Sequence, residues 1–143
     1  MAVDLDHSFA VGTSVDQTYA GIIDLERVIP LVEGGTVNER TGPDSVNAQI
    51  LVRMGAMSMT FKGSVEVAEK DEAAHRAVLR VRSKEEGGNG YANADVTFAL
   101  GDGEGKLHTH AQISGKAASM GEGVVAGVLD ALITDFTGKL ATL

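Results

Sequence analysis

Residues 117–140 read AASMGEGVVAGVLDALITDFTGKL, the longest stretch of the chain with a helical pattern of apolar residues. Met120, Val124, Val128, Leu132 and Phe136 recur every fourth residue, and a second apolar row runs beside them. The pattern predicts one continuous helix of roughly 36 Å, at about 1.5 Å per residue. A helix of this length can cover a whole face of a sheet.

Upstream of this stretch, apolar and polar residues mostly alternate, which is typical of half-buried strands. The alternation covers residues 3–11, 46–54, 57–67, 77–82, 92–100 and 107–113. Gly55 and Ala56 separate two of these segments and predict a hairpin turn. Ser14 and Gln17 stand at capping-box spacing after the first segment, which predicts a short helix, and a second short helix is expected to end near Pro30.

The order of these elements predicts an α+β fold in a single domain spanning residues 1–143. We expect a curved antiparallel sheet of about seven strands, two short helices after the first strand, and the long C-terminal helix held against the sheet. The sheet needs a cover for its apolar face, and only the last helix is long enough to provide it.

Composition excludes several classes of protein. The 143 residues are 43% hydrophobic and 22% charged, which fits a folded globular chain. The net charge of -8 would repel a phosphate backbone, so we expect no nucleic-acid partner. The chain has no cysteine, an acidic N-terminus and no run of roughly 18 apolar residues. These features predict a soluble, cytoplasmic protein.

Small residues are expected to dominate the interior, because the chain has 18 glycines but only four Phe and two Tyr. Two interpretations stay open. Glycines at 121, 123 and 127 could let the helix lie very close to the sheet and give a tight core. Alternatively, the small residues could leave an elongated apolar cavity rimmed by Met54, Met57, Met59 and Met120, whose flexible side chains suit an apolar guest.

Reactive groups are few. His108 and His110 share one face of a strand, but it is the polar face, so we expect solvated histidines and no metal site. His7 lies on the apolar face of its strand and is expected to be hydrogen-bonded and partly buried. His7 and Tyr91 are the faint candidates for a catalytic role, and we expect the protein not to be an enzyme.

Four segments of the chain resemble the carbon monoxide dehydrogenase CoxG family of the START-like (SRPBCC) superfamily. They are residues 24–30 (DLERVIP), 61–71 (FKGSVEVAEKD), 90–94 (GYANA) and 115–121 (GKAASMG). The resemblance implies a helix-grip fold with a deep hydrophobic pocket between the sheet and the long helix. It departs at residues 31–35, LVEGG, where many relatives carry a Cys-x-Pro-Gly-Ala-like turn.

The resemblance also implies a function. It predicts a carrier for a hydrophobic ligand, most specifically menaquinone or a similar isoprenoid quinone, with no covalent cofactor. The carrier would link the quinone pool to a CO dehydrogenase-type or other respiratory oxidoreductase, at the inner face of the cell membrane. Contact with the membrane would be transient or would use a C-terminal tail beyond Leu143. The alternative is a ligand-free adaptor that recruits such an enzyme to the membrane.

The predicted ligand-binding residues come from the inward-facing positions of the strands and of the last helix, with Met54 and Met57 as candidates for a mobile mouth. They are Ile50, Met54, Met57, Met59, Phe61, Ala92, Ala94, Val96, Thr109, Ala111, Met120, Val124, Val128 and Leu132.

Overall fold

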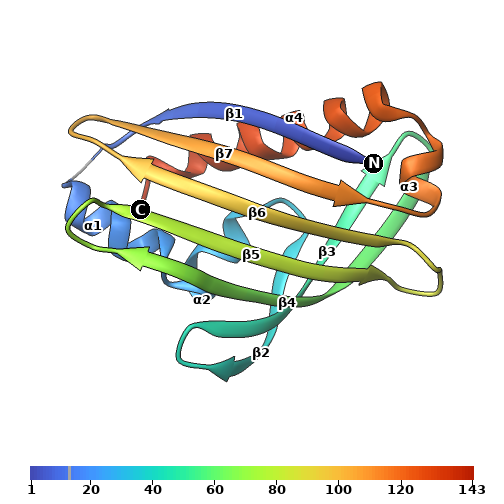
Figure 1. Ribbon diagram of the computed structural model, residues 1–143, viewed down its shortest axis with the longest axis horizontal. Coiled ribbons are helices and arrows are strands. Elements are labelled where there is room, and N and C mark those ends of the chain that lie inside the picture. Colours follow the sequence, from blue (N-terminus) through green and yellow to red (C-terminus); the bar gives the residue numbers. More distant parts are fainter. Residues whose placement is uncertain (13) are drawn as a thin grey trace.

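A computed structural model describes residues 1–12 and 14–143. Within these residues, seven strands form one antiparallel sheet in the order β1-β7-β6-β5-β4-β3-β2, and the sheet curves around the helix α4 (Figure 1). The strands are β1 (Ala2–Ala10), β2 (Gly35–Gly42), β3 (Ser45–Met54), β4 (Met57–Asp71), β5 (Arg76–Glu85), β6 (Tyr91–Leu100) and β7 (Glu104–Ile113). The helices are α1 (Val15–Ile22), α2 (Leu25–Val28), the 3-10 turn η1 (Ile29–Leu31), α3 (Lys116–Ser119) and α4 (Glu122–Leu140). The predicted α+β helix-grip architecture is confirmed.

The short helices follow the first strand as predicted. Ser14 is the N-cap of α1, and its Oγ accepts a hydrogen bond from the backbone N–H of Gln17 at 3.1 Å. This bond satisfies one of the four N–H groups that a helix start leaves without a partner. α2 passes directly into η1, which contains Pro30.

The prediction of one continuous helix over residues 117–140 is wrong. The chain forms two helices, α3 and α4, and Gly121 between them has a φ of 97° and a ψ of 151°. No helix can pass through this conformation, which glycine adopts without steric strain. α4 therefore has 19 residues and is about 28 Å long. The apolar periodicity continues from Met120 into α4, so the sequence pattern does not indicate the break at Gly121.

The alternating pattern of the sequence does not delimit β2. Its register with β3 shifts between Val37 and Glu39 and again between Arg40 and Gly42. A further shift separates Val67 and Glu69 where β4 pairs with β5. Register shifts of this kind bend and twist a strand, so they help the sheet to curl around α4.

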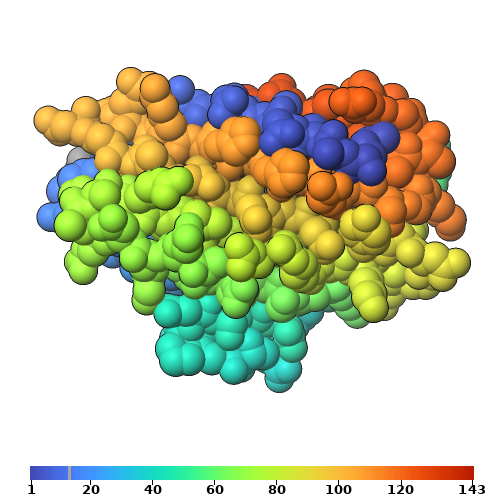
Figure 2. Space-filling model, in the orientation of Figure 1, coloured from blue at the N-terminus to red at the C-terminus, as the bar shows by residue number. Residues whose placement is uncertain are grey.

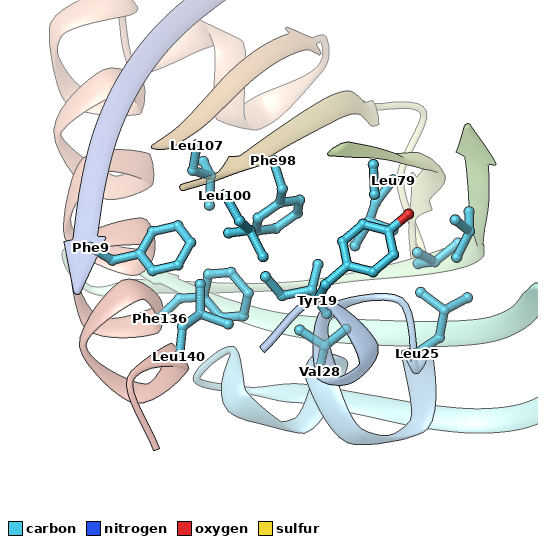
Figure 3. Packing of buried hydrophobic residues seen from close by; sticks show 14 of the residues in the cluster. Phe9, Tyr19, Leu25, Val28, Leu79, Phe98, Leu100, Leu107, Phe136 and Leu140 are labelled. Carbon is cyan, nitrogen blue, oxygen red and sulfur yellow. The ribbon is translucent and has the colours of Figure 1, made fainter. Parts of the chain in front are cut away.

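The buried apolar residues form two clusters. The larger cluster lies at the end of the molecule that α1 and α2 close, where Phe98 and Phe136 meet edge to face with ring centroids 6.4 Å apart (Figure 3). The smaller cluster joins Phe61, Ile113 and Val125 to Met54 and Met59 of the β3–β4 hairpin. The two clusters support α4 over the sheet from its two ends.

The long helix lies alongside β1 (Figure 1). His7 of β1 faces this helix, and its Nε2 lies 2.7 Å from Oδ1 of Asp130. The outer face of the sheet forms a continuous surface of side chains in the view of Figure 2. Access to the interior is therefore expected on the side of α4.

Candidate functional site

A cavity of about 260 Å³ lies between the inner face of the sheet and α4. The central strand β6 contributes Ala92, Ala94 and Val96, all of which remain partly accessible although they face inward. Ala94 is paired with Val81 on one side and with Ala111 on the other, so three short side chains stand in a row across the sheet. These short side chains leave the space that α4 then covers.

The walls of the cavity come from five strands, from the α2–η1 segment, from the start of β2 and from the middle and C-terminal part of α4. The lining residues are Val28, Ile29, Val32, Gly35, Ala48, Gln49, Ile50, Phe61, Gly63, Ser64, Val65, Leu79, Val81, Ser83, Ala92, Asn93, Ala94, Val96, Phe98, Leu107, Thr109, Ala111, Ile113, Leu129, Leu132, Ile133 and Phe136. No Asp, Glu, His, Lys or Arg is among these described residues. The site is therefore suited to holding an uncharged, mostly hydrocarbon molecule.

The structure brings together eight of the predicted ligand-binding residues. Those that line the cavity are Ile50, Phe61, Ala92, Ala94, Val96, Thr109, Ala111 and Leu132. Those that lie outside its lining are Met54, Met57, Met59, Met120, Val124 and Val128.

None of the four methionines predicted for the rim is among the residues that line the cavity. Met54 and Met59 are 3% and 4% exposed and are packed within the smaller cluster. Met57 and Val124 are on the surface, 38% and 45% exposed. Met120 is half-buried against the smaller cluster. The break at Gly121 explains part of the error, because residues before it cannot follow the phase of α4.

The helix glycines do not face the sheet. Gly121, Gly123 and Gly127 are exposed, and a Cβ added at any of them would meet no atom within 4 Å. The interpretation in which they allow close packing of the helix is therefore wrong. Leu129, Ile133 and Phe136 of α4 also line the cavity and are absent from the predicted site. Leu129 and Ile133 belong to the second apolar row of the helix, and Phe136 continues the first row, which was followed only as far as Leu132.

The side chains of two polar lining residues, Ser83 and Asn93, form hydrogen bonds with the backbone of the neighbouring strand. Ser83 donates a hydrogen bond from its Oγ to the carbonyl of Ala92, and the backbone N–H of Ser83 donates to Oδ1 of Asn93. Thr109 differs from them, because it is 5% exposed and its Oγ1 is buried without a hydrogen-bond partner. Its hydroxyl is thus an unsatisfied polar group in an apolar site.

The histidines all pair with aspartates. His7 is hydrogen-bonded and partly buried, as predicted, with a side chain that is 10% exposed. His108 and His110 lie on the outer face and contact Asp6 and Asp4 across the β1–β7 pair, each at 2.8 Å. Among the described residues, no group of three or more His, Asp or Glu side chains is arranged to hold a metal ion.

These contacts shift two pKa values on the outer face. Hydrogen bonding to His110 lowers the pKa of Asp4 below its ordinary 3.8, and the nearby charge of His110 adds to the effect. Hydrogen bonding to Asp6 raises the pKa of His108 above its ordinary 6.5. In the interior, burial raises the pKa of Tyr19 above 10.0, and its hydroxyl donates to the carbonyl of Arg76. None of these groups lines the cavity.

Known proteins similar to this chain point to one family. The model of the carbon monoxide dehydrogenase CoxG family matches residues 8–142. The curated proteins give no match. Within the described part of the chain, no helix has the length and apolarity that crossing a membrane requires.

Solved structures share the fold. A conserved protein from Geobacillus kaustophilus is 20% identical with a TM-score of 0.78, over 98% of this chain and 93% of that one. A protein from Thermus thermophilus is 10% identical with a TM-score of 0.70, over 99% and 98%. The ZhuI aromatase/cyclase from Streptomyces sp. R1128 is 12% identical with a TM-score of 0.63, over 99% and 93%. At these identities the likeness shows the fold alone.

Proposed function

Because the chain belongs to the carbon monoxide dehydrogenase CoxG family, we propose that it carries a hydrophobic molecule for an oxidoreductase of the CO dehydrogenase type. The guest we propose is menaquinone or a similar isoprenoid quinone, exchanged with the inner face of the cell membrane. The observation that supports a carrier is the uncharged cavity of about 260 Å³ under α4.

The energetics of such a site favour an apolar guest. Each buried CH2 group contributes about 0.8 kcal/mol, so roughly ten such groups would contribute about 8 kcal/mol before the entropic cost of association. No polar contact is needed for retention. A polar or charged molecule would lose its hydration without finding partners in this lining, so the site selects against it.

The volume limits how much of a long guest can be enclosed. Pockets for drug-sized ligands span about 300–1,000 Å³, so this cavity holds a small molecule or one end of a larger one. Ile29, Val32, Ile50 and Leu132 line the cavity and are half-buried. They belong to the η1 segment, β3 and α4, and we expect the remainder of a long guest to leave the cavity between these elements.

An enzymatic role is less well supported by the site. An acid–base reaction needs a titratable group within hydrogen-bond reach of the substrate. Tyr91 is 38% exposed, and neither it nor His7 is among the residues that line the cavity. An activity like that of the aromatase/cyclase with the same fold is therefore not part of this proposal.

The test is to identify what the purified protein holds. An organic extract examined by mass spectrometry should contain a quinone or another long apolar molecule, and protein stripped of lipid should take up menaquinone. An extract without any apolar molecule, together with stripped protein that takes up none, would contradict the carrier. If stripped protein still captures the oxidoreductase in that case, the ligand-free adaptor is the function.

A further inference from the structure

Thr109 is the polar residue of the cavity that the fold leaves unsatisfied. It is only 5% exposed, it lines the cavity, and its Oγ1 contacts neither a hydrogen-bond partner nor solvent. Buried hydroxyl groups in proteins nearly always have a hydrogen-bond partner, so a buried hydroxyl without one requires an explanation. Valine has the same shape as threonine and would fill this position without leaving a polar atom unpaired.

The position of Thr109 is well defined. It lies on β7 with its backbone between Leu5 of β1 and Val96 of β6. β1 is the strand along which α4 packs, so Thr109 belongs to the wall beneath the helix, away from η1 and β3. Rotation about its χ1 exchanges the hydroxyl and the methyl group, and threonine populates more than one such rotamer. The hydroxyl can therefore turn toward a guest.

We propose that the guest is an apolar molecule that carries a carbonyl oxygen, and that the hydroxyl of Thr109 donates a hydrogen bond to this oxygen. The inference rests on the proposed carrier function. A carbonyl suits the site because it brings an acceptor and no donor of its own, so one bond satisfies both groups. Ketones and quinones belong to this class.

The arrangement also sets the orientation of the guest. The carbonyl end enters first and lies against β7, while the hydrocarbon remainder extends toward the expected exit between η1, β3 and α4. This orientation fits the limited volume, because a carbonyl-bearing end is compact and the cavity encloses about 260 Å³.

His7 is the other described residue with a buried, unpartnered side-chain atom, its Nδ1. It is paired with Leu107, so it is a diagonal neighbour of Thr109 on the same face of the sheet, at a typical spacing of about 7–8 Å. His7 does not line the cavity, and its other nitrogen contacts Asp130. The carbonyl is therefore assigned to Thr109.

The test compares 2-undecanone with n-undecane, two probes of equal chain length that differ in one carbonyl. Both would displace a fluorescent apolar dye from lipid-stripped protein. In Thr109→Val the affinity for the ketone should fall roughly two- to tenfold, the range of one net hydrogen bond, while the affinity for the alkane stays the same. Thr109→Ser, which keeps the hydroxyl, should retain the ketone affinity.

Thr97→Val on the outward face of β6 is the matched control and should change neither affinity. Melting curves of the stripped variants check that each is folded, and Thr109→Val should melt no lower than wild type because it removes an unsatisfied group. Unchanged ketone affinity in folded Thr109→Val, or equal losses for both probes, would overturn the assignment. Wild-type protein that binds neither probe nor menaquinone would instead refute the carrier function itself.

Discussion

Replacing Ala94 with phenylalanine tests whether the guest occupies the cavity under α4. Ala94 lies in the middle of β6, between Val81 and Ala111, and its side chain faces the empty space. A phenyl ring at this position would extend into a volume of about 260 Å³ that is lined by apolar groups. The ring should therefore take the place of the guest without a steric clash against the sheet.

The two expected effects have opposite signs. Burying a phenylalanine side chain contributes about 1.5–3 kcal/mol, and imperfect packing of the ring removes about 1 kcal/mol of this, so stripped Ala94→Phe should gain about 0.5–2 kcal/mol of unfolding free energy. For a chain of this length, this corresponds to an increase in Tm of about 2–7 °C. The ring displaces about six guest carbons, worth about 5 kcal/mol, so uptake should fall by more than a hundredfold.

The assay is thermal unfolding of lipid-stripped protein together with uptake of menaquinone by the same samples. Stripping is needed because a bound guest itself raises Tm. Ala99→Phe is the matched control, since Ala99 is exposed on the outward face of the same strand. It should change the unfolding free energy by less than about 0.5 kcal/mol and leave uptake intact.

Two results would refute this reasoning. A folded Ala94→Phe variant that loads menaquinone as well as wild type would show that the guest binds elsewhere. A Tm lowered by several degrees would show that the space above Ala94 cannot accept a ring.

Three further predictions concern stability. Gly127→Ala should raise the unfolding free energy by about 1 kcal/mol, because this helical glycine is exposed and its added Cβ would meet no other atom. A lower unfolding free energy of the variant, measured by chemical denaturation, would contradict the placement of that helix face. Gly63→Ala should lower the unfolding free energy by about 3 kcal/mol or prevent folding, because the Cβ would overlap the carbonyl oxygen of Arg82; a melting curve like that of wild type would show that the strands can separate there. The contacts of Asp4 should stabilise the protein fully above pH 3.8, the ordinary pKa of Asp4, and this stabilisation should be lost as pH falls through the lowered pKa. The contacts of His108 should stabilise the protein fully below pH 6.5, the ordinary pKa of histidine, and this stabilisation should be lost as pH rises through the raised pKa. Thermal unfolding of wild type and Asp4→Asn should therefore differ most between about pH 3.8 and 6.5, and a difference that does not vary with pH would contradict the pairing.

The strands could be predicted from the sequence where apolar and polar residues alternate, because that alternation has the period of the sheet itself. β1, β3 and β7 are such strands. β2 could not be delimited in the same way, since two register shifts interrupt its pairing with β3 and Val37 is its only large apolar residue. The short helix α1 was predictable because its capping residue, Ser14, acts locally.

The site could be predicted only in part. Parity placed Ala94 and Thr109 on the inner face of the sheet, and both line the cavity. The four methionines proposed for the rim lie outside the lining. For Met120 the reason is the break at Gly121, which ends the phase of one helix and starts another, and no local signal distinguishes this glycine from Gly127. The unpaired state of the Thr109 hydroxyl depends on its whole surroundings, so no sequence pattern reports it.

The size of the cavity itself favours a role in binding over loose packing. Residual cavity volume in a protein core costs about 24 cal/mol per Å³, so an empty hollow of about 260 Å³ corresponds to about 6 kcal/mol. Folded domains are stable by only about 5–15 kcal/mol in total, so a void of this size would strain most of them. Here the clusters around Phe98 and around Phe61 hold α4 over the sheet from both ends and keep the hollow from collapsing. A guest that fills the space restores the missing contacts, and that recovered free energy is available for binding.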